Sequence, residues 1–355
     1  MRRYDWILIL AAFLLFSLGL AAIASVELSR GGHFAFVEKQ LVALGIGLAL
    51  GVFAARANFQ LFRSYARIAY FGGIILLLGL FLFGSTLNGT TGWYIIGGFA
   101  FQPVEVMKLG LILELARYFA DDARRPFGSR EFLGSGIRLA VPLFLVLLQP
   151  DFGSAILLLG IWAITAFFAG LELRHAAVLA AIVALGFLIG WFGLFQDYQK
   201  DRIRNFLYPA SDPLVSGYNV LQAEVAIGAG GFIGRGLGGG SQSQLRFLPE
   251  SQSDFIFAVI AEELGFLGIL LIFTGYALLL SRMLKLAYQS RDYFASSLVI
   301  GIFALFFMQI VIHIGANLAV MPATGIPLPL VSYGGTSLLL SLALLGTVES
   351  VAART

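Results

Sequence analysis

The chain has 355 residues, of which 59% are hydrophobic and only 12% charged, and its mean hydropathy is +0.89. It offers many apolar windows of roughly 20 residues, the length needed to cross a bilayer core of about 30 Å. The chain is therefore expected to be an integral membrane protein. The net charge is +3, and Lys and Arg cluster in the polar breaks between apolar windows. This basic balance indicates membrane topology and not binding of a nucleic acid.

Backbone polar groups in hydrocarbon must pair within their own segment, so these windows predict membrane-spanning helices. Runs such as Trp6 to Val26 and Phe294 to Gly315 are nearly continuous and lack the alternation of a β-barrel strand. We expect an all-α polytopic bundle of ten spans, at 6–26, 38–55, 69–84, 103–120, 136–149, 153–170, 174–195, 254–281, 294–316 and 332–351. Lys and Arg cluster on one side of such a bundle, which the positive-inside rule makes cytoplasmic together with both chain ends.

The residues available for chemistry are limited. There is no cysteine, which excludes disulfides, thiolate nucleophiles and cysteine-ligated metals. The three histidines, His33, His175 and His313, share no metal-ligand spacing. His313 falls inside the ninth span, where a hydrogen bond that packs one helix on another is the favoured interpretation and a functional role the other.

One large loop, about 196–253, follows the seventh span on the predicted outer side, and the whole chain is expected to form one domain around it. The loop contains both acidic and basic residues. The basic ones are Lys200, Arg202, Arg204, Arg235 and Arg246. They suit either an anionic ligand such as phosphate or ion pairs within a solvated loop. The glycine run at 228–240 lacks the βαβ context of a dinucleotide site, so tight folding or close approach of its backbone to a ligand is expected.

Charged residues also occur at the boundaries of spans and inside them. Asp254 directly precedes the eighth span, where a carboxylate could serve catalysis or cap the helix. Glu105 and Lys108 are three residues apart on the fourth span and predict an ion pair facing the bundle interior. Glu262 and Glu263 lie about two turns into the eighth span. Asp151, after Gln149-Pro150, is expected to cap the sixth span.

The segment from Met321 to Ser337 contains three prolines and three glycines at a predicted membrane boundary. Proline removes a backbone donor, so the segment cannot be a regular helix throughout. It is expected to be irregular, and either to line a wet cavity shielded by protein or to be a plain connection.

A series of motifs along the chain resembles the SEDS family of bacterial cell-envelope proteins, the group of RodA, FtsW and SpoVE, and most closely its RodA branch. The motifs are FQPVEVMK at 101–108, QPDFG at 149–153, SDPLVSGYN at 211–219, QAEVAIGAGGFIGRG at 222–236, QSQLRFLPESQSDFIFAVIAEELGFLG at 242–268 and TGIPLPLVSYGG at 324–335. Their order and spacing cover most of the chain. Departures are small: Val104 stands where a small residue is common, and Ser253 where threonine is usual.

The resemblance implies a peptidoglycan glycosyltransferase of about ten helices. It would polymerise lipid II on the outer face of the cytoplasmic (inner) membrane during cell elongation, by inverting transfer with polyprenyl pyrophosphate as the leaving group. Asp254 is then the expected general base. The expected substrate-binding residues are Arg202, Arg204, Arg246, Glu250, Ser253 and Gln244, supported within the membrane by Glu105, Lys108, Glu262 and Glu263.

The resemblance also implies partners: a class B penicillin-binding transpeptidase and other membrane proteins of the elongation complex. No cofactor is evident, although a divalent cation, Mg or Mn, is compatible with pyrophosphate chemistry. Two alternatives remain open at the level of sequence. A lipid II flippase would use the same cavity and charges without chemistry, and a non-catalytic scaffold of the wall-synthesis complex would tolerate loss of Asp254.

Overall fold

The computed structural model describes residues 4–354 except 29–30, 33, 88–89, 97–98, 122–126, 195–199, 201–203, 205–217 and 246. Within the described residues, each of the ten predicted spans corresponds to one long helix, and the fold is all-α apart from one small sheet. The helices are α1 (Trp6–Leu28), α2 (Ala35–Arg56), α3 (Phe59–Phe83), α4 (Pro103–Asp121), α5 (Ser129–Leu148), α6 (Phe152–Phe168), α7 (Leu173–Ile189), α11 (Ile256–Gln289), α12 (Tyr293–Asn317) and α13 (Gly335–Ala352).

Eight of these helices are both long and apolar enough to cross a membrane, which makes the chain a multi-pass membrane protein. The other two are α6, which has 17 residues, and α4, whose sequence includes Glu105, Lys108 and Glu114. Both pack against α12 near the centre of the bundle. Helix α6 is apolar and falls short in length alone, whereas the place of α4 among other helices explains how its charged residues are tolerated.

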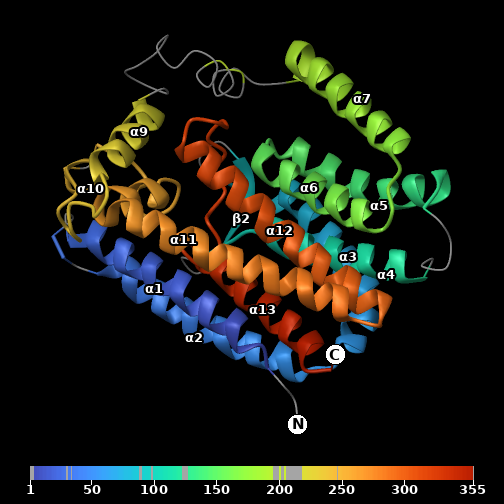
Figure 1. The fold of residues 1–355 in the computed structure, drawn as a ribbon. Coiled ribbons are helices and arrows are strands. Elements are labelled where there is room, and N and C mark those ends of the chain that lie inside the picture. The colour runs from blue at the N-terminus through green and yellow to red at the C-terminus, as the bar shows by residue number, and fades with distance from the viewer. Residues whose placement is uncertain are drawn as a thin grey trace.

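Both chain ends lie at the same end of the bundle (Figure 1). The backbone N–H of Asp5 donates to the Glu349 carboxylate at 3.0 Å, and the Asp5 carboxylate pairs with Arg282 of α11 at 2.6 Å. At the opposite end, Ser25 of α1 donates to Glu263 of α11 at 2.6 Å. Helices α1 and α11 are therefore antiparallel, and the beginning of α11, next to Asp254, lies away from the termini.

Close packing in the bundle depends on small residues. Helices α2 and α13 pack side by side, and a Cβ added at Gly346 would collide with the backbone of Gly51. Likewise, Gly110 of α4 lies against the backbone of α3 at Ala69 and Tyr70. Because lipid is as apolar as the helices, such close backbone approach is a main source of helix association in membranes.

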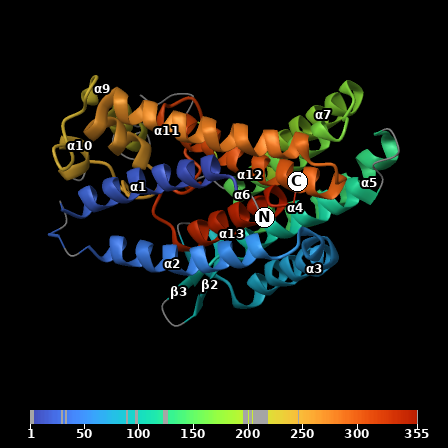
Figure 2. The same cartoon turned by 60° about the horizontal axis from the view of Figure 1, so that its bottom comes forward.

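A three-stranded antiparallel sheet, absent from the sequence predictions, follows α3. Its strands are β1 (Ser85–Leu87), β2 (Thr90–Ile96) and β3 (Phe99–Phe101), with β2 in the middle. The Tyr94 hydroxyl of β2 donates to the Leu76 carbonyl at 2.9 Å, which fixes the sheet to α3. Figure 2 shows the sheet projecting beyond the helices near α2 and α3.

Helix α7 stands apart from the bundle (Figure 1), and most of its side chains are exposed. Its N-terminal end is the part that packs: His175 is buried and stacks on Phe132 of α5, with ring centroids 5.2 Å apart. A five-residue π-helix, Gly190–Leu194, continues it. Apart from Arg174 in its first turn, the exposed surface of α7 is mostly apolar, as expected for a helix that faces lipid.

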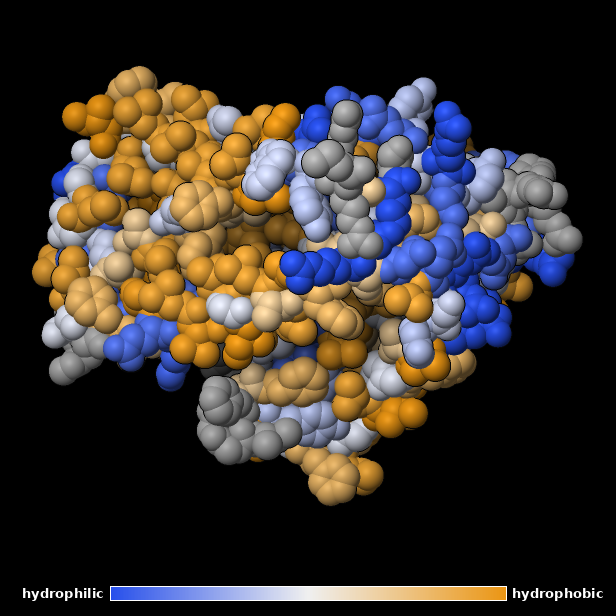
Figure 3. All heavy atoms as spheres, turned by 90° about the horizontal axis from the view of Figure 1, so that it is seen from below, coloured by the Kyte–Doolittle hydropathy of each residue, from blue (hydrophilic) through white to orange (hydrophobic). Residues whose placement is uncertain are grey.

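Hydrophilic side chains gather at one end of the face seen in Figure 3, and hydrophobic side chains cover most of the rest. The hydrophilic end is the one that holds the termini in Figure 1. This distribution matches the clustering of Lys and Arg on one side that the sequence predicts.

The predicted loop of 196–253 has regular structure in its described part. It contains α9 (Tyr218–Gly230) and the four-residue α10 (Ser241–Gln244). Helix α9 packs against α11, so this part of the loop is integrated into the bundle.

Candidate active site

Asp254 lies in the last turn before α11, at the end of the bundle opposite the termini. Its backbone N–H donates to the Glu250 carbonyl at 3.0 Å, and its side chain is partly exposed. Helix α11 begins at Ile256 and its N-cap residue is Phe255, which makes no side-chain cap. The N-cap position of α11 therefore falls on Phe255, one residue after the position that the capping interpretation gives it.

Three successive backbone carbonyls of this turn each accept a hydrogen bond from residues far along the chain. The Gln252 carbonyl accepts from the Tyr333 N–H at 2.9 Å. The Ser253 carbonyl accepts from the Ser332 hydroxyl at 2.8 Å, and the Asp254 carbonyl from the Asn317 amide at 2.9 Å. The backbone that carries the Asp254 side chain is thus fixed by α12 and by the residues that follow it.

Residues 318–334 between α12 and α13 contain no regular helix, as the prolines predict. The segment is largely buried at 326–332 and is held by side chains: the Ser332 hydroxyl accepts from the Leu328 N–H at 2.9 Å. His313 contacts the Ile326 carbonyl through Nδ1 at 2.8 Å, so its hydrogen bond joins α12 to this segment and not to another helix. A Cβ at Gly325, whose φ is +72°, would stand 3.8 Å from Asp254 Oδ2, so this segment forms a wall beside the carboxylate.

Tyr333 closes this segment. Its ring packs on Phe36 with centroids 4.8 Å apart, and burial, with a smaller effect from the Glu27 carboxylate, raises the pKa of its hydroxyl. The hydroxyl therefore stays protonated at neutral pH.

The predicted ion pair of Glu105 and Lys108 is confirmed. Lys108 Nζ lies 2.6 Å from Glu105 Oε1, and the two residues are 1% and 5% exposed. Glu105 Oε2 has no hydrogen-bond partner among the described residues. Pairing with Lys108 is what makes a carboxylate tolerable at such burial.

Glu262 and Glu263 hold the loop against α11. Glu262 accepts from the backbone N–H of Gln242 at 2.9 Å and of Ser243 at 3.1 Å. Glu263 accepts from Ser25 of α1 and from the Gln244 amide at 3.3 Å. Both glutamates are almost fully buried, so they join α1, α10 and α11 within the bundle.

Helix α11 is broken at Gly265, where φ is +63° and ψ is −156°. The glycine run replaces the lost helical hydrogen bonds: Phe266 N–H donates to the Gly231 carbonyl at 2.9 Å, and Gly236 N–H donates to the Glu263 carbonyl at 2.9 Å. A side chain at Gly234 would collide with the backbone of α11. The expected close backbone approach is thus observed, and its partner is another part of the chain.

The structure brings only some of the predicted site residues to Asp254. Glu250 and Ser253 lie in its turn, where the Ser253 hydroxyl donates to the Glu250 carbonyl at 3.3 Å. Arg204 is exposed, and Arg202 and Arg246 lie outside the described residues. Gln244 is bonded to Ser25 and Glu263. Asp151 caps α6 as predicted, accepting from the Ser154 N–H at 3.0 Å.

Sequence reasoning missed Asn317 and Ser332 as part of this site. Asn317 is the last residue of α12 and is fully buried, with Oδ1 accepting from the Ala258 N–H at 3.2 Å. The sequence signal for these two residues is weak. Asn317 is a single amide directly after the apolar run 294–316, and Ser332 is a single serine after three prolines.

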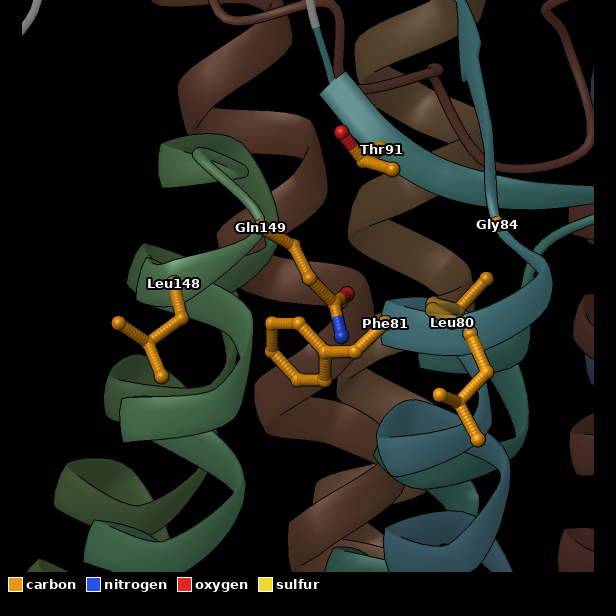
Figure 4. Close-up of a pocket in the computed structure, with 7 residues that line it drawn as sticks. Leu80, Phe81, Gly84, Thr91, Leu148 and Gln149 are labelled. Atoms are coloured by element: carbon orange, nitrogen blue, oxygen red, sulfur yellow. The ribbon is translucent and has the colours of Figure 1, made fainter.

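A cavity of about 180 Å³ lies at the same end of the molecule, between α3, β2 and the end of α5 (Figure 4). Gln149 points into this region, and its amide donates to the Leu77 carbonyl at 2.9 Å. None of the predicted site residues lines the cavity, so it is separate from the surroundings of Asp254. In the described part of the chain, no three His, Asp or Glu residues are placed to hold a metal ion together.

Comparison with known proteins covers almost the whole chain. The chain is 37% identical over 348 residues to the peptidoglycan glycosyltransferase MrdB of Escherichia coli K12. The match covers 97% of this chain and 92% of MrdB. A solved structure of a peptidoglycan synthase complex contains a chain that matches with a TM-score of 0.85 and 31% identity, covering 100% of this chain and 99% of that one.

The crystal structure of the rod shape determining protein RodA of Thermus thermophilus matches with a TM-score of 0.74 and 29% identity, covering 99% of this chain and 97% of RodA. The family profile described as cell cycle protein, which unites FtsW, RodA and SpoVE, matches residues 4–355. The chain therefore belongs to the FtsW, RodA and SpoVE family of cell cycle proteins, as its motifs predict.

Proposed function

We propose that this protein is a peptidoglycan glycosyltransferase that polymerises lipid II, with Asp254 as its general base. The observation that carries the proposal is a carboxylate that is partly exposed while its backbone is held by three hydrogen bonds from residues 317–333. A general base needs access to the substrate and a fixed position, and the partial exposure of Asp254 and its held backbone support that role. The activity named for MrdB is the chemistry that the proposal brings to this chain.

In the proposed reaction, the 4-hydroxyl oxygen of one sugar attacks the anomeric carbon of another. A carbon–oxygen bond forms there as the bond from that carbon to the pyrophosphate oxygen breaks, and the pyrophosphate leaves with the electron pair. The hydroxyl proton passes to the Asp254 carboxylate. One carboxylate is sufficient for a single displacement with inversion, because the leaving group is already a good anion.

Cationic side chains would stabilise that leaving group. Arg204 is exposed on the described part of the loop, and Arg202 and Arg246 complete the proposed set. A guanidinium matches two phosphate oxygens at once, which suits a pyrophosphate. Glu250, Ser253 and Gln244 remain proposed contacts to the substrate.

The proposal places Asp254 on the outer face of the cytoplasmic membrane and both termini in the cytoplasm. The basic residues at the end that holds the termini support this orientation through the positive-inside rule. A class B penicillin-binding transpeptidase is the proposed partner, supported by the likeness to a chain of a complex that coordinates polymerisation and crosslinking.

The test is polymerisation of purified lipid II in liposomes, alone and with a transpeptidase partner whose own active site is disabled. We expect glycan polymer from the wild type and none from Asp254→Asn, which keeps the shape of the side chain but removes the base. Asp292→Asn is the matched control, because Asp292 caps α12 at the other end and asparagine caps equally well. Transfer of lipid II across the bilayer with no polymer would support a flippase instead. The absence of both activities would support a scaffold.

A further inference from the structure

The polar contacts of Asn317 connect two helices at the point where the Asp254 backbone lies. Asn317 ends α12 and is 0% exposed. Its Oδ1 accepts from the Ala258 N–H at 3.2 Å, and its Nδ2 donates to the carbonyls of Asp254 and His313, both at 2.9 Å. Both N–H donors of the amide are thus used, and its oxygen accepts one hydrogen bond.

The two halves of this amide perform different tasks. Ala258 is in the first turn of α11, whose N–H groups have no helical partner, and Phe255 makes no side-chain cap. Asn317 Oδ1 therefore serves as a cap supplied by a neighbouring helix. Its Nδ2 acts on a different residue, because it holds the carbonyl of Asp254 itself.

We infer that Asn317 is a positioning residue for Asp254, and this inference rests on the role proposed above for that carboxylate. Asn317 is 0% exposed, so the role inferred for it is indirect. It fixes the peptide group immediately after the Asp254 side chain, and Ser332 and Tyr333 fix the two preceding carbonyls. A displacement of about 1 Å at a catalytic group can lower a rate by roughly a hundred-fold, so loss of this hydrogen bond acts on turnover.

Asn317→Asp separates the two tasks. The new carboxylate keeps the acceptor for Ala258, where a negative charge near a helix N-terminus is favourable, but it removes the donors to Asp254 and His313. It also brings an oxygen against those two carbonyls, so the melting temperature of this variant is expected to fall. Asn317→Ser is the second variant, since its short hydroxyl is easily accommodated but cannot span both Ala258 and Asp254. Tyr276→Phe is the comparison variant, because it removes one buried hydrogen bond to the same segment, at Pro329, and none of the three that hold the Gln252, Ser253 and Asp254 carbonyls.

The measurement is the rate of lipid II polymerisation against lipid II concentration in liposomes, with the melting temperature of each variant in detergent. We expect Asn317→Asp and Asn317→Ser to fold and to lose about ten- to a hundred-fold in kcat with little change in KM. Tyr276→Phe should keep the wild-type kcat.

Wild-type kcat in folded Asn317→Asp and Asn317→Ser, together with an inactive Asp254→Asn, would overturn the inference and leave the proposed function intact. Equal losses of kcat in Tyr276→Phe and in the Asn317 variants would also overturn it, since the effect would then be general loosening of residues 318–334. An active Asp254→Asn would remove the premise and the inference together.

Discussion

At the scale of single residues, the buried charges of this protein are arranged so that each has a specific partner. Glu105 has Lys108, Glu114 of α4 has Arg138 of α5 at 3.0 Å, and Glu262 and Glu263 have N–H and O–H donors of the loop and α1. An ion removed from water without a partner is strongly destabilising, so these positions are sensitive to single changes.

Replacing Lys108 by methionine is expected to destabilise the protein by roughly 3–5 kcal/mol, because the Glu105 carboxylate stays buried and unpaired. The double variant Glu105→Gln, Lys108→Met removes both charges and should recover most of that loss. Thermal unfolding in detergent measures both. A double variant that is less stable than Lys108→Met would contradict this account of the pair.

Glu262→Gln is expected to cost about 1–3 kcal/mol, because one of the two oxygens that accept from the Gln242 and Ser243 backbone becomes an amide donor. The loop should loosen before the bundle unfolds. Hydrogen exchange of residues 241–244, compared with the middle of α12, is the measurement. Unchanged protection at 241–244 would show that Glu262 does not hold the loop.

At the scale of elements, α11 and the glycine run at 228–240 form one unit. The irregular backbone of the run makes hydrogen bonds to the backbone groups of α11 that the break at Gly265 leaves without helical partners. Gly234 and Gly236 both have positive φ, +79° and +85°. They differ in their surroundings: a Cβ at Gly234 would meet the backbone of Glu263 and Gly265, whereas a Cβ at Gly236 would meet nothing within 4 Å.

This difference supplies a matched pair of variants. Gly236→Ala should cost only the left-handed backbone strain, about 1–2 kcal/mol. Gly234→Ala should cost clearly more, since the collision with α11 is added to the same strain. Melting temperatures in detergent compare the two, and Gly228→Ala, with open space and no positive φ, serves as control. Equal losses for Gly234 and Gly236 would show that the close contact contributes nothing.

The elements were predictable where one physical signal decides them. Hydropathy found all ten long helices but underestimated those that continue beyond the apolar core: α3 begins at Phe59, ten residues before the predicted span, through a stretch that includes Arg63 and Arg67. Proline content correctly indicated an irregular 321–334 segment. The small sheet was missed because its outer strands have only three residues each.

The site was predictable only in its local parts. Asp254 follows from its position before a span, and the Glu105 and Lys108 pair from spacing along one helix face. The contacts of Asn317 and Ser332 join residues 63 and 79 positions apart. No periodicity or local propensity reports such a pairing, because it results from how α12 and residues 318–334 pack on the start of α11.

At the scale of the whole molecule, the bundle has two different ends: one with the termini and the hydrophilic side chains seen in Figure 3, the other with Asp254. The absence of cysteine makes this polarity directly measurable with single cysteine substitutions. Tyr288, 92% exposed at the end of α11, marks the first end, and Leu245, 65% exposed after α10, marks the second.

In right-side-out membrane vesicles, a membrane-impermeant maleimide is expected to label Leu245→Cys before lysis and Tyr288→Cys only after it. The proposed orientation by the positive-inside rule is the reason. The cysteine-free parent chain is the control for background labelling. The opposite pattern would place Asp254 in the cytoplasm and remove the proposed access to an external substrate.

The three hydrogen bonds on the Gln252, Ser253 and Asp254 carbonyls also set an order in time. Their donors, at 317, 332 and 333, leave the ribosome 63 to 81 residues after the carbonyls that they hold. At a synthesis rate of about 5–20 residues per second, these donors are synthesised several seconds after Asp254. A growing chain that has reached the eighth span thus contains the proposed base but not yet the site, and full assembly coincides with the last stages of translation.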